Sequence, residues 1–436
     1  MEIAKQHSRK NRQKLLDGEQ NMPSVDRLSG LPDAVLCHIL YFLPTKLFVA
    51  TNILAKRWRF LWSHVPNLDF DGENHGRGTS FSNIINRIMF LHKVQNLTTF
   101  RLYYKDNNIS DYELETWVMI AMARNVQNLD VRLGCLLMLP RCLFTCKTLV
   151  DLRLIDCMGV PSSCTISLPS LKKLQFQIDE ALPHLLIGCP VLEELIIDDI
   201  YIIDVKLDCF NIFSLTLKRL TVNFPFDSVI FCGIGFKVKI NAPALTYLNL
   251  QDSVSTHISA QMLTYLIEAD ILFGYCMAEG EDYYFKSMVK FIDSLCNMKC
   301  LKLSSDLELE SDRGHADHIN RAFVDQSISI RRFNSLTKLE LAADWFFLTK
   351  FLESADNLEV LIILEVRGSM KNWVKPKQVP TCLLSHLRSV RIDLFEGMEN
   401  EFSMVRYLLW NAKVLERGLH RISLFQRRSA CEIAFY

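Results

Sequence analysis

The side chains with the most reactive chemistry in this sequence do not form a catalytic pattern. Two cysteine pairs, Cys142 with Cys146 and Cys296 with Cys300, have the three-residue separation that some zinc ligands use. Neither has a second His or Cys pair close by, so buried structural thiols are the favoured interpretation. The eleven histidines are scattered, and hydrolase, zinc-protease, phosphate-loop and dinucleotide-binding motifs are absent. We therefore expect no enzyme, no metal site and no cofactor.

The composition indicates a folded, leucine-rich protein. Of the 436 residues 64 are leucine, and 49% are hydrophobic against 22% charged. Lys and Arg number 49, as do Asp and Glu, so no net charge attracts nucleic acid or a membrane surface. We find neither a secretory signal nor a long apolar span. The expected location is the cytoplasm, the nucleus or both, with reduced cysteines.

The elements that must position any functional side chain follow from a recurring leucine pattern. The motif L-x-x-L-x-L is typical of leucine-rich repeats, whose period is about 20–29 residues. Matches here are 21 to 38 residues apart, so the repeat is irregular. Each match predicts a short strand whose inward leucines share one core with the next repeat, which gives an α/β solenoid. The twelve matches begin at Leu97, Val126, Leu149, Leu171, Leu192, Leu217, Leu245, Leu266, Met298, Leu336, Leu358 and Leu387.

Between the inward leucines, other side chains are expected to line the concave face, where solenoids commonly bind partners. These side chains carry both signs of charge, which argues against a phosphate-binding track. Because aromatic and arginine residues often dominate binding energies, Arg219 and Tyr247 in neighbouring repeats are the candidate substrate-binding pair. An ordinary solvated face is the alternative, with the long connections at 272–297 and 304–335 as another location for the site.

A compact helical unit at residues 25–71 precedes the repeats. Pro32 suits the first position of a helix, Pro44 ends that helix, and Thr45 can cap the next one. About three short helices carry more apolar surface than ~45 residues can hide, so a partner is expected. Two apolar sets follow helical spacing: Leu36, Ile39, Leu40 and Leu43, and then Leu54, Trp58, Leu61 and Trp62.

The C-terminal part predicts a strand at 387–394 followed by a helix at 399–416. We expect that strand to pair with the last repeat and the helix to cap the end of the solenoid, as terminal repeats must. Residues 1–24 are polar and are expected to be disordered. The expected organisation is a tail at 1–24, the helical unit at 25–71, a linker and helix at 72–93, repeats at 94–372, a terminal domain at 373–424 and a tail at 425–436.

Several motifs of the helical unit and of the terminal domain resemble a known family. The unit resembles an F-box through Leu31-Pro32-Asp33, Leu43-Pro44-Thr45-Lys46, the block from Leu54 to Trp62 and the exit from Val65 to Phe70. The terminal domain resembles an FBD through Phe395-Glu396-Gly397 and the stretch from Leu408 to Glu416. With the repeats between them, the chain resembles the plant F-box/FBD/leucine-rich-repeat family over nearly its whole length. Asn52, Ala55 and Trp410 depart from the usual residues but remove no apolar anchor.

This resemblance implies a role in ubiquitin transfer. The F-box would dock on a Skp-family adaptor of a Skp–cullin–F-box (SCF) ubiquitin ligase, which includes a cullin and a RING subunit, while the repeats hold a protein substrate. Neither nucleic acid nor a membrane is an expected partner. The alternative is a leucine-rich-repeat scaffold that acts without ubiquitination, although such a scaffold has no use for an F-box. The adaptor contacts expected from the resemblance are Leu31, Pro32, Ile39, Leu40, Leu43, Leu54 and Trp58.

Overall fold

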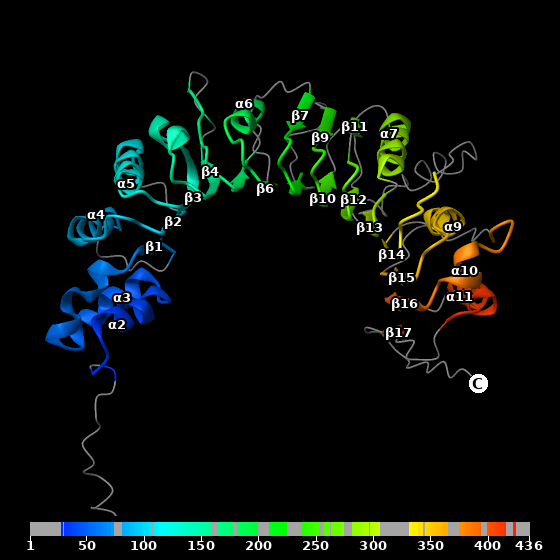
Figure 1. The fold of residues 1–436 in the computed structure, drawn as a ribbon, viewed down its shortest axis with the longest axis horizontal. Helices are drawn as coiled ribbons and strands as arrows, with labels where there is room; N and C mark the ends of the chain where they lie inside the picture. Colours follow the sequence, from blue (N-terminus) through cyan, green and yellow to red (C-terminus); the bar gives the residue numbers. More distant parts are fainter. Residues whose placement is uncertain are drawn as a thin grey trace, which may run out of the picture.

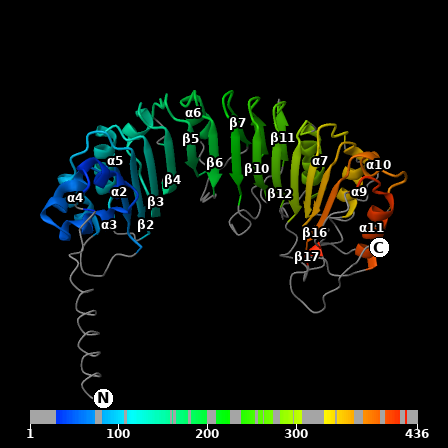
Figure 2. The same ribbon diagram turned by 60° about the horizontal axis from the view of Figure 1, so that its bottom comes forward.

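The computed structural model describes the greater part of the chain between residues 28 and 423. The described residues form one arch, with strands along the concave side and most helices along the convex side (Figure 1, Figure 2). The expected tails at 1–24 and 425–436 lie outside the described residues. These residues are 28, 30–73, 81–105, 109–157, 160, 164–177, 181–198, 209–224, 237–252, 257–261, 263–273, 281–295, 297–305, 331–342, 345–364, 375–393, 399–415 and 422–423.

A parallel sheet of 14 strands lines the concave side. Each of the twelve leucine motifs leads into one of its strands, from β2 to β16, so the predicted solenoid is confirmed. In sheet order the strands are β1 Asn67–Asp71, β2 Thr99–Tyr104, β3 Asn128–Leu137, β4 Asp151–Cys157, β5 Lys173–Phe176, β6 Glu194–Asp198, β8 Arg219–Asn223, β10 Tyr247–Asp252, β12 Glu268–Phe273, β13 Cys300–Ser305, β14 Lys338–Ala342, β15 Val360–Ile363, β16 Ser389–Asp393 and β17 Ile422–Ser423.

Rows of inward leucines form the core behind this sheet. Leu195, Leu220 and Leu248 stand side by side in the register of β6, β8 and β10, and none of them is exposed to solvent. Burying one such side chain stabilises the fold by about 1.5–3 kcal/mol. Because each row is buried only by its neighbours, the strands are held in a common register.

The segments that return along the convex side contain most of the helices. The α-helices are α2 Asp33–Tyr41, α3 Thr45–Ala50, α4 Phe81–Leu91, α5 Asp111–Ala123, α6 Leu182–Ile187, α7 Glu281–Ser294, α9 Trp345–Ser354, α10 Thr381–Ser385 and α11 Glu399–Asn411. Short 3₁₀ helices are η1 Thr51–Ile53, η2 Lys56–His64 and η3 Arg141–Thr145. The helix expected from Phe81 to Leu91 is confirmed as α4.

In the middle of the arch, three strands replace these helices. They are β7 Cys209–Phe213, β9 Lys237–Asn241 and β11 His257–Gln261, and they form a second parallel sheet on the convex side (Figure 1). The leucine pattern does not predict this sheet, although its strands alternate between buried and outward residues. Alternation over only five residues is a weak signal beside the longer leucine pattern.

The sheet also begins earlier than the expected repeat boundary at residue 94. Strand β1 lies inside the segment assigned to the helical unit, and it pairs in parallel with β2. Val65, Leu68 and Phe70 are all buried and have the spacing of the leucine motif, a signal that could have located this strand. The helical unit is therefore joined to the solenoid without an intervening linker.

Within the helical unit, two of the expected helix ends shift by one residue. Pro32 is the N-cap of α2, which starts at Asp33, and Pro44 is the N-cap of α3, which starts at Thr45. The predicted capping role of Thr45 is wrong, because its buried hydroxyl accepts a hydrogen bond from the Asp69 backbone N–H, at 2.6 Å. That bond ties α3 to the first strand of the sheet.

The C-terminal part extends the same sheet. Strand β16 pairs with β15, as predicted, and occupies 389–393 within the expected strand. Helix α11 ends at Asn411 rather than at residue 416, and it lies beside α10 on the outer side of the last repeats (Figure 1). The sheet continues past it to β17, so the helix covers the flank of the terminal repeat rather than the open edge.

Candidate functional site

The helical unit exposes many large apolar side chains. One set follows the outer face of α2 at helical spacing, namely Val35, Ile39 and Phe42, which are 42%, 38% and 70% exposed. A second set lies on α3, η1 and the following residues: Leu47, Ile53, Leu54 and Phe60. Exposed apolar side chains in this number on a small unit make it a candidate interaction site.

The seven residues expected to contact an adaptor fall into three groups. Pro32, Ile39 and Leu54 are exposed, and Leu31 and Leu43 are partly buried against the core. Leu40 and Trp58, by contrast, are only 1% and 5% exposed, so they pack inside the unit.

Helical spacing placed Ile39 in one apolar set with Leu36 and Leu40. In the structure these residues lie on two different faces of α2. Leu36 and Leu40 point into the core, whereas Ile39 lies on the exposed side of the helix with Val35. Both faces are apolar, so the sequence pattern alone could not identify the outer one. Val35 and Phe42 were missed for this reason, and the exposed Leu47, Ile53 and Phe60, on α3, η1 and η2, were missed as well.

Arg57 fixes the start of α2 against η2. Its guanidinium donates to Asp33 Oδ1, at 2.6 and 2.8 Å, and to the backbone carbonyl of Leu31, at 2.5 Å. The bonds hold the Leu31-Pro32-Asp33 turn beside the block that contains Trp58. The turn is thereby kept in position next to the exposed apolar face.

A buried histidine links the helical unit to the repeats. The Nε2 of His92 lies 2.8 Å from the backbone oxygen of Val65, and its Nδ1 lies 3.1 Å from a guanidinium nitrogen of Arg124. Because the carbonyl can only accept and the guanidinium can only donate, the imidazole is neutral with its proton on Nε2. Burial, together with the Arg124 charge, lowers the pKa of His92 from its ordinary 6.5 to about 4.

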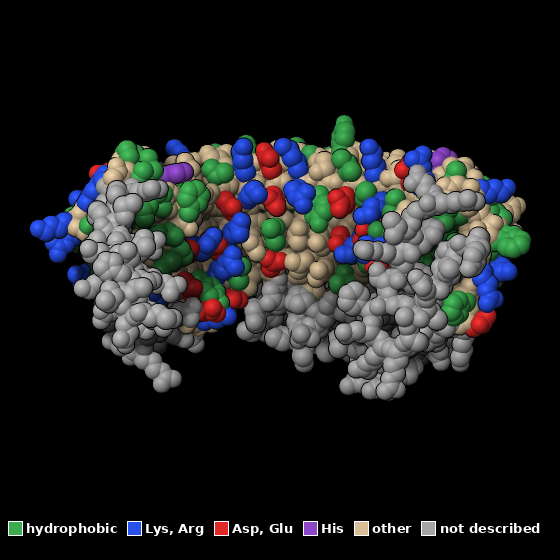
Figure 3. All heavy atoms as spheres, turned by 90° about the horizontal axis from the view of Figure 1, so that it is seen from below, with side chains coloured by type: hydrophobic (Ala, Val, Ile, Leu, Met, Phe, Trp, Pro, Cys, Tyr) green, Lys and Arg blue, Asp and Glu red, His purple; other side chains and the backbone are tan. Residues whose placement is uncertain are grey.

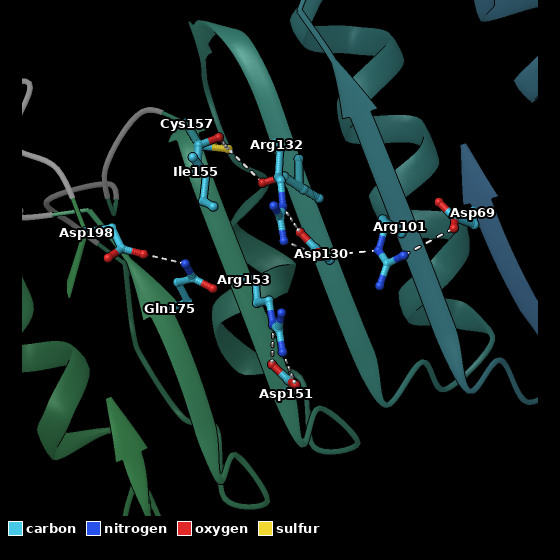
Figure 4. A network of polar contacts seen from close by, with 11 residues as sticks. Asp69, Arg101, Asp130, Arg132, Asp151, Arg153, Ile155, Cys157, Gln175 and Asp198 are labelled. Atoms are coloured by element: carbon cyan, nitrogen blue, oxygen red, sulfur yellow. Dashed lines mark hydrogen bonds and ion pairs between the residues drawn. The ribbon is translucent and has the colours of Figure 1, made fainter. Parts of the chain in front are cut away.

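Charged side chains on the first strands of the concave face neutralise one another across the sheet. Arg101 lies between two carboxylates, 3.2 Å from Asp69 and 3.3 Å from Asp130 (Figure 4). Arg132 forms a second pair with the nearly buried Asp130, at 2.9 Å, and Arg153 pairs with a carboxylate on its own strand. Further along, Asp198 accepts hydrogen bonds from Gln175 and Asn223.

The candidate pair in the middle of the concave face is brought into direct contact. Arg219 and Tyr247 are register partners on β8 and β10, and the guanidinium carbon lies 4.0 Å from the centre of the tyrosine ring. This is the geometry of a cation–π interaction. Arg219 also faces Glu194, at 3.9 Å, which in turn pairs with Lys173 at 2.8 Å. The structure thus joins the two predicted residues on one surface, while their role stays a prediction.

Ion pairs continue towards the C-terminal end. Lys302 pairs with Asp270 at 3.0 Å, and there are pairs within single strands between Lys338 and Glu340 and between Arg391 and Asp393. Viewed from the concave side, basic and acidic side chains alternate across the described strands (Figure 3). The face can therefore hold a partner by matched contacts rather than by a field of one sign.

The candidate zinc pairs are not supported by a cluster of ligands. Cys142 and Cys146 are free thiols at and just after η3, and Cys142 is exposed rather than buried. The other pair cannot be compared, because Cys296 lies outside the described residues. Within the part of the chain that the structure describes, no group of three or more His, Cys, Asp or Glu side chains could hold a metal ion.

Fold and surface together define a leucine-rich-repeat solenoid that carries an apolar helical unit at one end, and sequence comparisons give its relatives. Residues 375–417 match the FBD family model, and residues 114–314 match the model described as FBD-associated F-box protein At5g56370, LRR repeats. The F-box/FBD/LRR-repeat protein At4g00160 of Arabidopsis thaliana is 33% identical, over 90% of this chain and 85% of that protein. The F-box/FBD/LRR-repeat protein At3g52680 of the same plant is 32% identical, over 90% and 84%. The chain therefore belongs to the plant F-box/FBD/LRR-repeat family.

A search for membrane spans gives a negative result: none of the helices among the described residues combines the length and the apolar character that crossing a bilayer requires.

The buried histidine predicts a pH-dependent stability. The unfolded chain binds a proton at His92 near pH 6.5, whereas the folded chain resists it down to about pH 4. The free energy of unfolding should therefore fall as the pH drops from 7 to 5, by at most about 1.4 kcal/mol per pH unit from this group. Urea denaturation at pH 7 and pH 5 measures this difference in the free energy of unfolding.

The variant His92→Gln, which keeps a donor for Val65, should make the free energy of unfolding less dependent on pH. The variant His38→Gln, at an exposed histidine, should not. An equal slope in wild type and His92→Gln would contradict this assignment.

Proposed function

We propose that the chain is the substrate-recognition subunit of an SCF ubiquitin ligase. Its helical unit docks on a Skp-family adaptor, and its repeats hold the protein substrate. The observation that carries the proposal is the exposed apolar surface of the helical unit in a chain of the F-box/FBD/LRR-repeat family. The ligase partners supply the chemistry, and this chain supplies recognition.

The proposed adaptor surface uses the exposed members of the expected set together with their neighbours. Pro32, Ile39 and Leu54 contribute directly, with Val35 on the same helix as Ile39 and Phe42 at the C-cap of that helix. Leu40 and Trp58 act from within, because they fill the core on which this surface rests. Burying several large side chains, at about 1.5–3 kcal/mol each, offsets the cost of association.

The proposed substrate surface is the concave face, with Arg219 and Tyr247 at its centre. Both are at least partly accessible, and their mutual stacking presents a flat, preorganised pair to a partner. The paired charges on either side favour a partner with complementary charges in a defined order.

Changing the exposed residues should separate adaptor binding from folding. Ile39→Asp together with Leu54→Asp should abolish co-purification with a Skp-family adaptor and leave the thermal midpoint of the chain nearly unchanged, because both side chains are exposed and neither belongs to the buried core. Leu40→Ala should instead destabilise the unit by about 2–5 kcal/mol, as buried truncations do. Ile187→Asp with Tyr265→Asp, at exposed apolar positions of the repeats, is the matched control and should still co-purify with the adaptor. Wild-type adaptor recovery by the first variant would rule out this surface.

Replacing the central pair should weaken substrate capture alone. Arg219→Ala with Tyr247→Ala should reduce binding of a substrate identified by affinity purification under proteasome inhibition by roughly tenfold or more, as loss of an interface hot spot does. Arg391→Ala with Asp393→Ala removes another concave pair, near the C-terminal end, and serves as the control. Adaptor binding should be unaffected in both variants. If the central variant captures substrate as well as wild type does, the substrate site lies elsewhere.

A further inference from the structure

The small convex sheet presents a flat outer face whose side chains have no part in the solenoid core. Val238 and Ile240 of β9 point inward and are buried, so Lys237 and Lys239 point outward. In register beside Lys239 stand Asn211 on β7 and Ser259 on β11. Helix α6 contacts β7 and helix α7 contacts β11, so both edges of this sheet have a helix beside them.

Three lysines gather on this face without acidic partners among the described residues. Lys237, Lys239 and the exposed Lys290 of α7 form no ion pair with any described residue. His257, the register partner of Lys237, contacts Ser287 of α7, with 2.7 Å between Nδ1 and Oγ. Burial lowers the pKa of His257, and the charges of Lys237, Lys290 and Lys239 lower it further.

On the concave side, by contrast, basic side chains are paired with carboxylates. There, Arg101, Arg132, Lys302 and Arg391 each face a carboxylate within 3.3 Å. The basic charge on the convex sheet is instead left uncompensated within the described part of the chain. Unpaired charges at this density attract a partner of opposite sign.

We propose that the outer face of the β7–β9–β11 sheet binds an acidic, extended segment of a partner protein. Alternate residues of a strand are about 6.4–6.8 Å apart, so Lys237 and Lys239 match carboxylates at alternate positions of an extended peptide lying along β9. Asn211 and Ser259 can hydrogen-bond its polar groups, and Phe213, 55% exposed, offers an apolar contact at the end of β7. The lysines form a cluster rather than a track along the arch, which favours a short peptide over a nucleic acid.

This binding face is separate from the adaptor and concave surfaces, so its test does not depend on the proposed ligase role. The probe is a short fluorescein-labelled peptide in which glutamate alternates with serine and which ends in phenylalanine. Its anisotropy is measured with the full-length chain at low and high salt. A peptide with glutamine in place of glutamate is the control ligand.

Lys237→Glu with Lys239→Glu should weaken binding of the acidic peptide by about tenfold or more, because each attraction becomes a repulsion. Lys172→Glu with Lys299→Glu makes the same change of charge at exposed lysines just before β5 and β13, and should alter binding less than about twofold. Binding by wild type that salt weakens and that the glutamine peptide lacks would support the proposal.

Three results would overturn it: equal binding by the Lys237/Lys239 variant and wild type, equal binding of the glutamine peptide, or tighter binding of a single-stranded oligonucleotide at the same lysines. The last would indicate a nucleic-acid surface instead. Thermal unfolding of each variant checks that the exposed substitutions leave the fold intact.

Discussion

A strand of this solenoid can bury its leucines only when another strand stands beside it in register. Leu220 is buried between Leu195 on one side and Leu248 on the other. From β1 to β16, the inward side chains of each strand depend in the same way on the neighbouring strands for their burial. Since β1 follows directly after the helical unit, that unit is held to the end of the same ladder. The bond from Asp69 to Thr45 and the contacts of His92 with Val65 and Arg124 strengthen the junction.

This arrangement gives the protein two surfaces with different chemistry at set places along one arch. The helical unit exposes apolar side chains such as Ile39 and Phe42, which suits a stable protein partner. The concave face carries paired charges around the Arg219–Tyr247 stack and suits recognition by complementarity. A partner on the helical unit and another on the concave face would be held in a defined relation to each other, as transfer between them requires.

The sequence predicted the repeats well and their surfaces only in part. Twelve strands could be located because the leucine spacing records which side chains face the core. Strand β1 was missed because Val65, Leu68 and Phe70 were assigned to the end of the helical unit, and the convex sheet because its alternation is short. The exposed face of α2 could not be identified from the sequence, because Leu36 on the buried face and Ile39 on the exposed face are both apolar. Ion pairs such as Arg101 with Asp69 depend on the register of strands 32 residues apart in the chain, which local patterns do not contain.

Hydrogen–deuterium exchange of the chain, alone and with a Skp-family adaptor, measures directly whether the helical unit is the docking element. We expect new protection across residues 31–62, centred on α2 and η1, with exchange in the concave strands β6 to β12 unchanged. A variant with Ile39→Asp should show none of this protection. Protection confined to the repeats, or an adaptor complex that leaves residues 31–62 unprotected, would contradict the assignment of the helical unit as the docking element.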